Sequence, residues 1–278
     1  MTMDRYCVMG NPIEHSRSPG IHARFAELTG QSIDYTRQLV PLDGFAQAVQ
    51  ALRESPEARG CNVTVPFKFD AAAVADHVSE RAQLAQAVNF LHFKDDGIHG
   101  DNTDGIGLVH DVTAHAGLDL QGRDVLLLGA GGGSSGALGP LLASGVRRVV
   151  VANRTLAKAI TLVRRHAAFA LGHHVDLEAQ SLDAVRGSFD LVVNATASSL
   201  SGGGVPVAPG VLGSGTLALD MMYGPAAAGF MAWAREHGAT PRDGLGMLIE
   251  QACEAFFLWR GVRPPAAQVL AELRAIVG

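Results

Sequence analysis

Cysteine is scarce in this chain of 278 residues. The three cysteines, Cys7, Cys61 and Cys253, lie far apart and form neither a CxxC pair nor the spacing of a zinc site. So few and so widely spaced, they exclude a disulfide framework. They are typical of free thiols in a reducing compartment, and we therefore expect a cytoplasmic protein.

Charged and aromatic residues are also few, at 18% and 6% of the chain, and the net charge is −5. A mildly acidic chain has no general attraction for nucleic acid or for an anionic membrane, so we expect neither as a partner. Hydrophobic residues make up 47% of the chain, which excludes a disordered protein and leaves a globular one.

Long hydrophobic runs are missing as well. The longest, DVLLLGAGGGSSGALGPLLASGV, is interrupted by glycines and indicates a strand, a glycine loop and a helix instead of a transmembrane segment. The first residues, MTMDRYCVMGNP, lack the basic and apolar regions of a signal peptide. The eleven histidines form no HExxH pattern, and His173 and His174 have no cysteine or acid at ligand spacing, so we expect no metal.

What the chain does have is a regular alternation of strand-like and helix-like segments. Residues 1 to about 105 alternate in this way, which predicts a mostly parallel sheet covered by helices. A second strand–helix series starts at RDVLLLG, after a helical segment, GIGLVHDVTAHAG, that marks the change of domain. The pattern therefore predicts an α/β protein of two domains, 1–105 and 106–244, with helices in 245–278 packing back on the first.

Several local features predict individual elements. Ser18 is expected to cap a helix that continues through Pro19 and ends at Gly30. Asn62 to Val65 alternate as a short strand does before Pro66 stops it, and residues 68–87 have a helical pattern. The Asp96–Gly97 pair predicts the turn of a β-hairpin.

The strongest local signal is VLLLGAGGGSSG, in which glycines follow a strand directly and a helix begins near Ser134. Glycines in this position let backbone N–H groups approach a pyrophosphate, and the helix N-terminus stabilises its charge. The interpretation as a turn without a ligand is the alternative, which the strand–loop–helix context disfavours. The expected dinucleotide contacts are Gly129, Ala130, Gly131, Gly132, Gly133 and Ser134.

The end of the next strand, RRVVVANRTLAK, predicts which dinucleotide binds. An NAD site would carry an acid there for the ribose hydroxyls, and this strand has none. Two cations and two small polar residues stand in its place and suit a 2′-phosphate: Asn153, Arg154, Thr155 and Lys158. We therefore expect NADP as the cofactor.

Small polar residues and a lysine gather at other strand ends. Ser16 and Ser18 precede a helix, where two hydroxyls and the helix N-terminus would make a cradle for a carboxylate. Lys68 follows the strand that ends at Pro66, where a solvated surface charge is the ordinary interpretation. Asp101 and Asp104 stand in the loop GDNTDG, and aspartates in such loops most often form Asx turns.

Taken together, the motifs NPIEHSRSP, NVTVPFK, AVN, GDNTDGIGL, GAGG, NRT, VNAT, DMMYGP and DGLGMLIEQA resemble those of the shikimate dehydrogenase family. They occur in order from residue 10 to about 264. The resemblance implies an N-terminal substrate-binding and catalytic domain, a C-terminal Rossmann-type NADP-binding domain, and the NADP-dependent, reversible reduction of 3-dehydroshikimate to shikimate.

The resemblance also implies roles for individual residues. Lys68 and Asp104 match the family's catalytic pair, which would pass a proton at the ring hydroxyl that is oxidised. Positions that bind the substrate hydroxyls are matched by Asn62, Thr64, Asn89 and Gln251. The carboxylate site is matched by Ser16, Ser18 and Tyr223, and the nicotinamide pocket by Met221 and Gly244.

The chain departs from the family pattern at Ser135, where many relatives have an arginine after the glycine loop, and this lowers the expected cofactor affinity. Two other functions stay open: a dehydrogenase of the same family acting on quinate, and a non-catalytic nucleotide-sensing protein on the same scaffold. The second would not need Lys68 and Asp104 together. A small-molecule substrate is the expected partner, with the chain a monomer or a homodimer.

Overall fold

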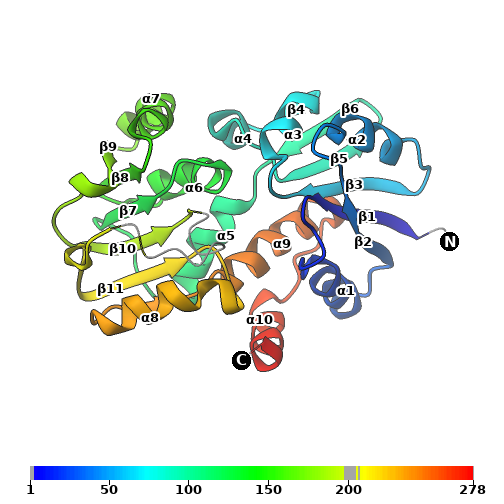
Figure 1. Cartoon of the computed structure of the whole chain (residues 1–278). Coiled ribbons are helices and arrows are strands. Elements are labelled where there is room, and N and C mark those ends of the chain that lie inside the picture. Colours follow the sequence, from blue (N-terminus) through cyan, green and yellow to red (C-terminus); the bar gives the residue numbers. More distant parts are fainter. Residues whose placement is uncertain (1–2, 197–204, 206, 278) are drawn as a thin grey trace. The chain divides into compact units, whose positions relative to one another are not determined.

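The computed structural model describes residues 3–196, 205 and 207–277, and its chain divides into two compact units (Figure 1). The first unit comprises Met1–Gly107 and Ile249–Leu273, and the second comprises Leu108–Leu248 and Arg274–Gly278. The sequence places the domain boundaries after residues 105 and 244, and the units change after residues 107 and 248. Each unit is built around its own six-stranded sheet, and the two are described separately.

The sheet of the first unit has the strand order β2-β1-β3-β5-β6-β4. Strand β1 pairs in parallel with β2 and β3, and the hairpin β5–β6 adds antiparallel pairs. The strands are β1 (Asp4–Gly10), β2 (Ile33–Leu39), β3 (Ala58–Val63), β4 (His77–Val78), β5 (Phe90–Lys94) and β6 (Gly97–Asp101). The helices are α1 (Ser18–Thr29), α2 (Phe45–Arg53), α3 (Lys68–Val74), α4 (Glu80–Ala85), and most of α9 (Leu245–Arg260) and of α10 (Ala266–Val277).

Alternating side chains of β1 supply both hydrophobic cores of this unit. Cys7 and Met9 face the core formed with α2 and α3, and Tyr6 and Val8 face the core that α9 completes. Trp259 on α9 contacts the Tyr6 ring at a centroid distance of 4.5 Å and donates a hydrogen bond of 3.1 Å to the Leu91 carbonyl. Helix α9 is thereby fixed to the middle of the sheet.

The single helix expected over residues 68–87 is wrong. Helix α3 ends at Val74, and His77 and Val78 form β4, which pairs in parallel with β6. Helix α4 then begins at Glu80. Ser79 is its N-cap residue, and the Ser79 hydroxyl accepts a hydrogen bond from the Ala82 N–H. Pairing with β6 overrides the helical pattern of the sequence here.

Three other local expectations have different outcomes. Ser18 does not cap α1: the helix has Arg17 at its N-cap position and no side-chain cap, although Gly30 does end it with a φ of 65°. The strand expected through Val65 ends earlier, at Val63. The hairpin at Asp96–Gly97 is confirmed by the β5–β6 pairing.

The second unit has an all-parallel sheet with the order β12-β11-β10-β7-β8-β9. Its strands are β7 (Asp124–Leu128), β8 (Arg148–Asn153), β9 (Asp176–Ser181), β10 (Phe189–Asn194), β11 (Leu212–Asp220) and β12 (Thr240–Arg242). Its helices include α5 (Asp104–His110, shared with the first unit), α6 (Gly132–Ala143), α7 (Leu156–Gly172) and α8 (Ala228–Glu236). A π-helical turn, η1 (Asp111–His115), follows α5, and short 3-10 turns are η2 (Leu182–Ala184), η4 (Pro209–Val211) and η5 (Gly224–Ala227).

Both faces of this parallel sheet are covered, as its sequence indicates. Leu127 and Val149 belong to the core under α6 and α7, whereas their neighbours Leu126 and Val150 belong to the core that includes Phe230 of α8. Strands buried on both faces have continuous apolar runs, and VLLL and VVVA are such runs. The observed architecture is therefore α/β with parallel-rich sheets, as predicted.

Among the described residues, no helix has both the length and the apolar character needed to cross a membrane.

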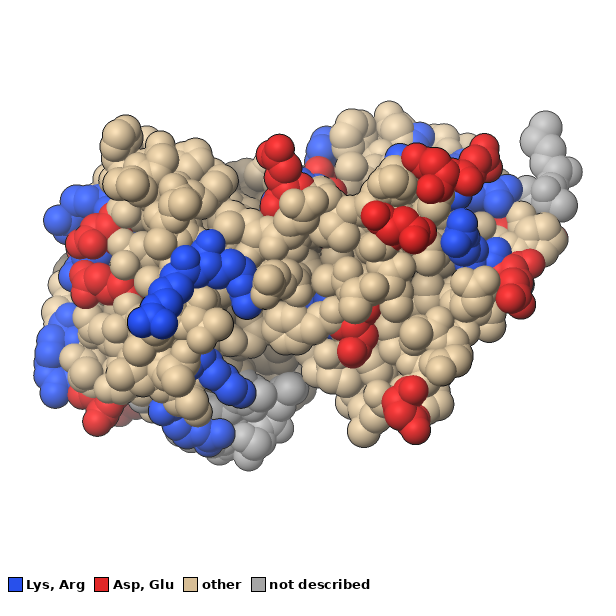
Figure 2. Space-filling model, turned by 90° about the horizontal axis from the view of Figure 1, so that it is seen from above, with Lys and Arg blue, Asp and Glu red and all other residues tan. Residues whose placement is uncertain are grey.

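Figure 2 shows Lys and Arg side chains over the second unit, at the left, with Asp and Glu beside them and uncharged surface between. On the face drawn, the charges are mixed and do not form one continuous basic patch.

Candidate active site

Lys68 is placed by the turn that follows β3. Phe67, the residue before it, is fully buried and stacks on Phe45 at a centroid distance of 5.0 Å. The Phe67 N–H donates to the Thr64 carbonyl at 3.0 Å, which closes the turn. Lys68 is then the first residue of α3, where a cation opposes the helix dipole. A lysine in this position therefore does not stabilise the helix.

Asp104 is the partner of Lys68. It is the first residue of α5, only 5% exposed, and its Oδ2 atom lies 2.6 Å from Lys68 Nζ. The side chain of Lys68 is itself only 15% exposed. Removing two charges from water costs several kcal/mol per ion, so a buried pair is poor evidence for a purely stabilising role. The ordinary interpretation of Lys68 as a solvated surface charge does not hold.

Asn89 fixes the other oxygen of Asp104. Its Nδ2 atom donates to Asp104 Oδ1 at 2.8 Å, to Thr103 Oγ1 at 3.0 Å and to Gln251 Oε1 at 3.4 Å. Its Oδ1 atom accepts from the Thr103 N–H at 2.8 Å. The Asn89 amide therefore has protein partners on both sides, and the Asp104 carboxylate is oriented by Lys68 and Asn89 together.

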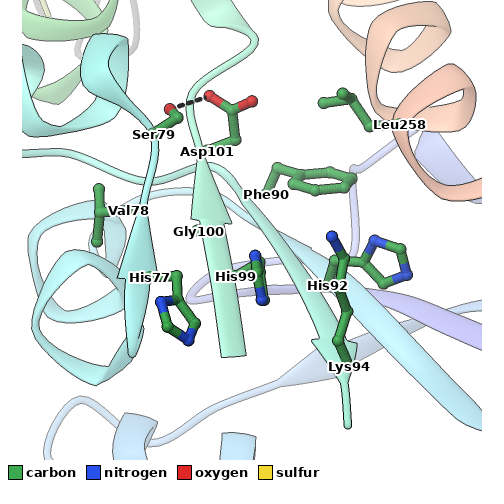
Figure 3. Close-up of a pocket in the computed structure, with 10 residues that line it drawn as sticks. All are labelled: His77, Val78, Ser79, Phe90, His92, Lys94, His99, Gly100, Asp101 and Leu258. Carbon is green, nitrogen blue, oxygen red and sulfur yellow. Dashed lines mark hydrogen bonds between the residues drawn. The ribbon is translucent and has the colours of Figure 1, made fainter. Parts of the chain in front are cut away.

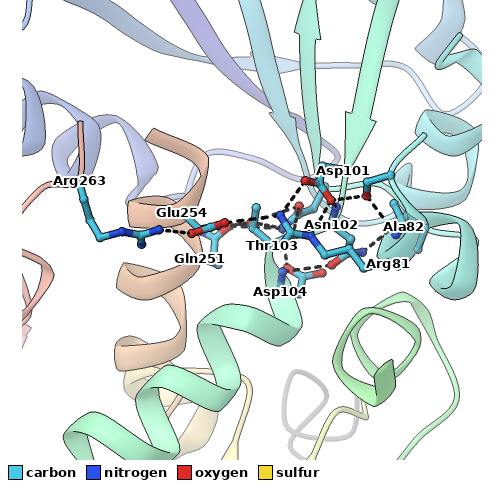
Figure 4. A network of polar contacts seen from close by, with 12 residues as sticks. Arg81, Ala82, Asp101, Asn102, Thr103, Asp104, Gln251, Glu254 and Arg263 are labelled. Atoms are coloured by element: carbon cyan, nitrogen blue, oxygen red, sulfur yellow. Dashed lines mark hydrogen bonds and ion pairs between the residues drawn. The ribbon is translucent and has the colours of Figure 1, made fainter. Parts of the chain in front are cut away.

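A wider network of polar contacts holds the loop that carries Asp104 (Figure 4). Asp101 accepts two hydrogen bonds from Arg81, at 2.7 and 2.6 Å, and the Asp104 N–H donates to Asn102 Oδ1 at 3.1 Å. Arg81 also lies 3.6 Å from Glu254 on α9. Asp101 is thus a structural residue that ties the loop to α4, and not a free loop carboxylate.

Asn62 lies at the same end of the sheet as Asn89. Its Nδ2 atom donates to the Asn89 carbonyl at 3.2 Å, and its Oδ1 atom accepts from the Tyr35 hydroxyl at 2.7 Å. Burial raises the pKa of Tyr35, so the phenol stays protonated and acts as the donor. The Asn62 side chain is therefore held in one orientation, as a residue that binds one ligand group would need to be.

Ser16, Ser18 and Thr64 are the remaining predicted residues of this unit. The hydroxyl oxygens of Ser16 and Ser18 lie 3.2 Å apart, and the Ser18 N–H donates to Ser16 Oγ at 3.3 Å. Thr64 is half-buried, and within the described part of the chain its hydroxyl makes no hydrogen bond. The structure brings the two serines together and leaves the Thr64 hydroxyl available for a ligand.

Three contributors were missed by the sequence interpretation: Tyr35, Thr103 and Arg81. Thr103 is fully buried between Asn89 and Gln251, and it belongs to the quoted motif GDNTDG, which was a signal for it. Tyr35 and Arg81 have no such local signal. Their contacts cross 27 and 20 residues of chain, and only the folded sheet shows them.

In the second unit, the glycine loop takes the form that the sequence predicts for a dinucleotide site. Gly129 follows β7 with a φ of 106°, a conformation that favours glycine. Helix α6 begins at Gly132, two residues earlier than expected, with Gly131 at its N-cap position. The Ser134 hydroxyl is buried and has no hydrogen-bond partner among the described residues. Free N–H groups in the first turn of α6 suit a pyrophosphate.

Met221 and Gly244 lie close together beside this loop. A Cβ atom at Gly244 would come within 2.3 Å of the Met221 carbonyl oxygen, so only glycine allows this approach of the two backbones. A Cβ atom at Gly133 would lie 3.2 Å from the Met221 sulfur. Met221 is therefore in contact with the glycine loop. Tyr223, predicted for the carboxylate site, is half-buried in the second unit, two residues beyond Met221.

Asn153, Arg154, Thr155 and Lys158 lie at the carboxyl end of β8 and the start of α7. Asn153 Nδ2 donates to the Thr155 carbonyl at 2.9 Å, which shapes the turn. Arg154 and Lys158 are exposed, and neither makes an ion pair with any residue that the structure describes. Two unpaired cations without an acid at this strand end fit the 2′-phosphate of NADP and not the free ribose of NAD.

A glycine turn at the end of β7 in an all-parallel sheet defines the second unit as a dinucleotide-binding domain. The buried Lys68–Asp104 pair in the first unit adds groups suited to proton transfer. Fold and residues thus define a dinucleotide-dependent α/β oxidoreductase of two domains.

Comparison with known proteins identifies the family. Three family models match: the shikimate dehydrogenase substrate binding domain over residues 8–91, shikimate / quinate 5-dehydrogenase over residues 112–201, and the shikimate 5′-dehydrogenase C-terminal domain over residues 244–274. The shikimate dehydrogenase (NADP(+)) of Paracidovorax citrulli is 64% identical over 98% of this chain and 97% of its own length. The chain belongs to the shikimate dehydrogenase family, as its motifs predict.

Two solved structures are similar to this chain over nearly its whole length. An Ael1 enzyme from Pseudomonas putida is 45% identical, with a TM-score of 0.89 over 97% of this chain and 98% of its own. Shikimate 5-dehydrogenase from Thermus thermophilus, solved in complex with NADP(H) and shikimate, is 30% identical, with a TM-score of 0.85 over 98% of this chain and 99% of its own.

Proposed function

We propose that this chain catalyses the reversible, NADP-dependent reduction of 3-dehydroshikimate to shikimate. The observation that carries the proposal is the buried Lys68–Asp104 contact of 2.6 Å, in a chain 64% identical to a shikimate dehydrogenase that uses NADP. A non-catalytic nucleotide sensor on the same scaffold would have no need to bury these two charges together. An enzyme therefore has a reason to bury Lys68 and Asp104 together, and a sensor does not.

Proton transfer is the role that we assign to Lys68 and Asp104. When bound, NADPH would supply the hydride for the ring carbonyl. The oxygen of that carbonyl gains negative charge as it is reduced, and the Lys68 ammonium is the group that donates a proton to it. Asp104 holds Lys68 in place and stabilises its positive charge, and Asn89 holds Asp104. In the reverse direction, the Lys68 amine accepts the proton of the substrate hydroxyl.

The remaining residues of the first unit orient the substrate. The Thr64 hydroxyl and the fixed amides of Asn62 and Gln251 offer donors and acceptors for ring hydroxyls, and the contacts of Asn89 suit it mainly to positioning Asp104. The paired hydroxyls of Ser16 and Ser18 suit the substrate carboxylate, because hydrogen bonds to a charged acceptor are stronger than neutral ones. Tyr223 is assigned to the same carboxylate from the family motif.

The second unit holds the cofactor. We assign the pyrophosphate to residues 129–134, the 2′-phosphate to Arg154 and Lys158 with Asn153 and Thr155, and one side of the nicotinamide pocket to Met221 and Gly244. Three buried free thiols support our expectation of a reducing, cytoplasmic setting. The chain acts alone or as a homodimer, with no macromolecular partner required by this chemistry.

A steady-state assay tests the proposal with the untagged full chain, using shikimate and quinate, each with NADP⁺ and with NAD⁺. We expect the highest kcat/KM for shikimate with NADP⁺. A higher kcat/KM for quinate would show that the chain is instead a dehydrogenase of the same family that acts on quinate. No turnover with any of the four pairs, despite binding of NADP⁺, would support the nucleotide-sensing alternative.

A further inference from the structure

Three side chains with metal-ligating atoms meet at the edge of the first unit's sheet, outside the proposed active site. His77 on β4 and His99 on β6 are direct partners in the parallel register of these strands, and their rings lie 4.6 Å apart. Asp96, in the turn of the β5–β6 hairpin, is the third. One ligand atom from each residue lies within 4.8 Å of the other two. Figure 3 shows His77 and His99 side by side on their strands.

The distances are close to those that a tetrahedral ion requires. With metal–ligand bonds of about 2.0–2.1 Å, two ligand atoms at a tetrahedral ion are about 3.3 Å apart. His99 Nε2 lies 2.9 Å from Asp96 Oδ1, and His77 Nε2 lies 4.0 Å from Asp96 Oδ2. These two separations bracket the required value. His77 and Asp96 are exposed and His99 is half-buried. Side-chain rotations that release the 3.2 Å contact between His77 Nε2 and the Asp96 carbonyl oxygen would complete the geometry without moving the strands.

The chemistry of the three groups selects a class of ion. Asp96 offers carboxylate oxygens, and His77 and His99 offer ring nitrogens. Two imidazoles and one carboxylate are ligands that zinc accepts, whereas magnesium and calcium prefer sites made of oxygen atoms alone. The cysteines Cys7, Cys61 and Cys253 are all buried and do not compete for the ion.

We propose that His77, Asp96 and His99 form a binding site for a divalent transition-metal ion, with zinc as the best match. A surface pocket of about 280 Å³, lined by His77 and His99 among others, adjoins the site and leaves room for a water molecule as the fourth ligand. His92 lines the same pocket, but its ring points away from His99 in Figure 3 and is not part of the ligand set.

The site would add a link at the edge of the sheet, where β4 already pairs with β6. Strand β4 has only two residues and lies at the sheet edge, where β6 is its single neighbour among the described strands. An ion bound by His77, His99 and Asp96 links β4 both to β6 and to the hairpin turn. Because the ion binds only the folded arrangement, it should raise the thermal unfolding temperature of the protein.

The test uses untagged full-length protein, treated with EDTA and then freed of it, and measures Zn²⁺ binding by calorimetric titration. The variants are His77→Asn, His99→Asn and Asp96→Asn. Loss of a ligand should weaken binding at least about tenfold, the lower end of what loss of an outer-shell partner costs. The matched control is the double variant His173→Asn with His174→Asn, because both residues are exposed neighbours in the second unit.

The expected result is one Zn²⁺ per chain, a higher unfolding temperature with Zn²⁺, little response to Mg²⁺, and unchanged affinity in the His173/His174 control. Unfolding temperatures measured without metal show whether each variant is folded. Equal Zn²⁺ affinity in the wild type and the three ligand variants would overturn the proposal, as would the absence of Zn²⁺ binding by the wild type. A loss of affinity confined to the His173/His174 variant would assign the binding to that pair and would also overturn it.

Discussion

Lys68 Nζ lies 2.6 Å from Asp104 Oδ2, although 36 residues separate these two along the chain. Each is the first residue of a helix, α3 and α5, and each follows a strand of the same sheet, β3 and β6. The sheet therefore brings two charged groups together where strands end. Their joint burial, and not the presence of either alone, distinguishes a catalytic pair from two surface charges.

Removal of the Lys68 amine should lower kcat strongly and change KM for shikimate little. General acid–base groups contribute about 10²–10⁴-fold to rate, and we expect a loss in this range for Lys68→Ala and Lys68→Met. The chain offers a matched control in Lys94→Ala, because Lys94 is an exposed lysine of the same unit. If Lys68→Met kept near-full kcat while Lys94→Ala did the same, Lys68 would have no part in proton transfer.

The Ser16 hydroxyl should contribute to KM for shikimate and not to kcat. A hydrogen bond to a charged group is worth roughly 1.5–3 kcal/mol, so Ser16→Ala should raise KM about 10- to 100-fold. A contact that is equal in the ground and transition states leaves kcat unchanged. Ser55→Ala, at a half-buried serine whose hydroxyl bonds Glu57, serves as the control. Unchanged KM in Ser16→Ala would remove Ser16 from the carboxylate site.

Arg154 should set the preference for NADP over NAD. Two exposed cations at the 2′-phosphate, partly screened by salt, should give about a hundredfold higher kcat/KM with NADP⁺. Arg154→Asp removes an attraction and adds a repulsion, so it should reverse the order. Arg164→Asp makes the same charge change farther along α7 and should not reverse it. A variant Arg154→Asp that still prefers NADP⁺ would show that the phosphate binds elsewhere.

His22 should make the protein less stable in acid. It is fully buried and stacked on Tyr35 at 4.2 Å, and burial lowers its pKa from 6.5 to about 3. Between these pH values the unfolded chain takes up a proton that the folded chain does not. His22 therefore leaves the free energy of unfolding unchanged above pH 6.5 and lowers it as the pH decreases toward 3. At about 1.36 kcal/mol per pH unit, this group costs about 2 kcal/mol by about pH 5.

The measurement for His22 is the free energy of unfolding in urea at several pH values. In His22→Phe the decrease between about pH 6.5 and about pH 5 should be smaller than in the wild type by about that amount. His173→Asn, at an exposed position, should keep the wild-type slope. Equal slopes in the wild type and His22→Phe would show that His22 is not the origin of the acid sensitivity.

Local chemistry explains which parts of the fold could be predicted. The runs VLLL and VVVA, the Gly129 turn and the Asp96–Gly97 hairpin depend on neighbouring residues, and each was predicted from the sequence. The break after Val74 was not predictable, because β4 forms only through its pairing with β6. Tertiary pairing overrides local propensity in such short segments.

The candidate site shows the same division. Lys68 and Asp104 could be named from family motifs, but their contact requires the fold. The Asn89–Gln251 contact crosses 162 residues, and no spacing in the sequence points to it. His77 and His99 lie on β4 and β6, so their proximity also depends on the strand pairing that the sequence did not predict.

The most direct test of the account is a double-mutant cycle in kcat with Lys68→Met, Asp104→Asn and the combined variant, assayed with shikimate and NADP⁺. If the two residues act as one proton-transfer unit, the second substitution should cost little once the first is made. The double variant should then lose about as much kcat as the Lys68 variant alone. A fold-loss of kcat in the double variant equal to the product of the two single fold-losses would contradict the account, because it would mean that Lys68 and Asp104 act separately.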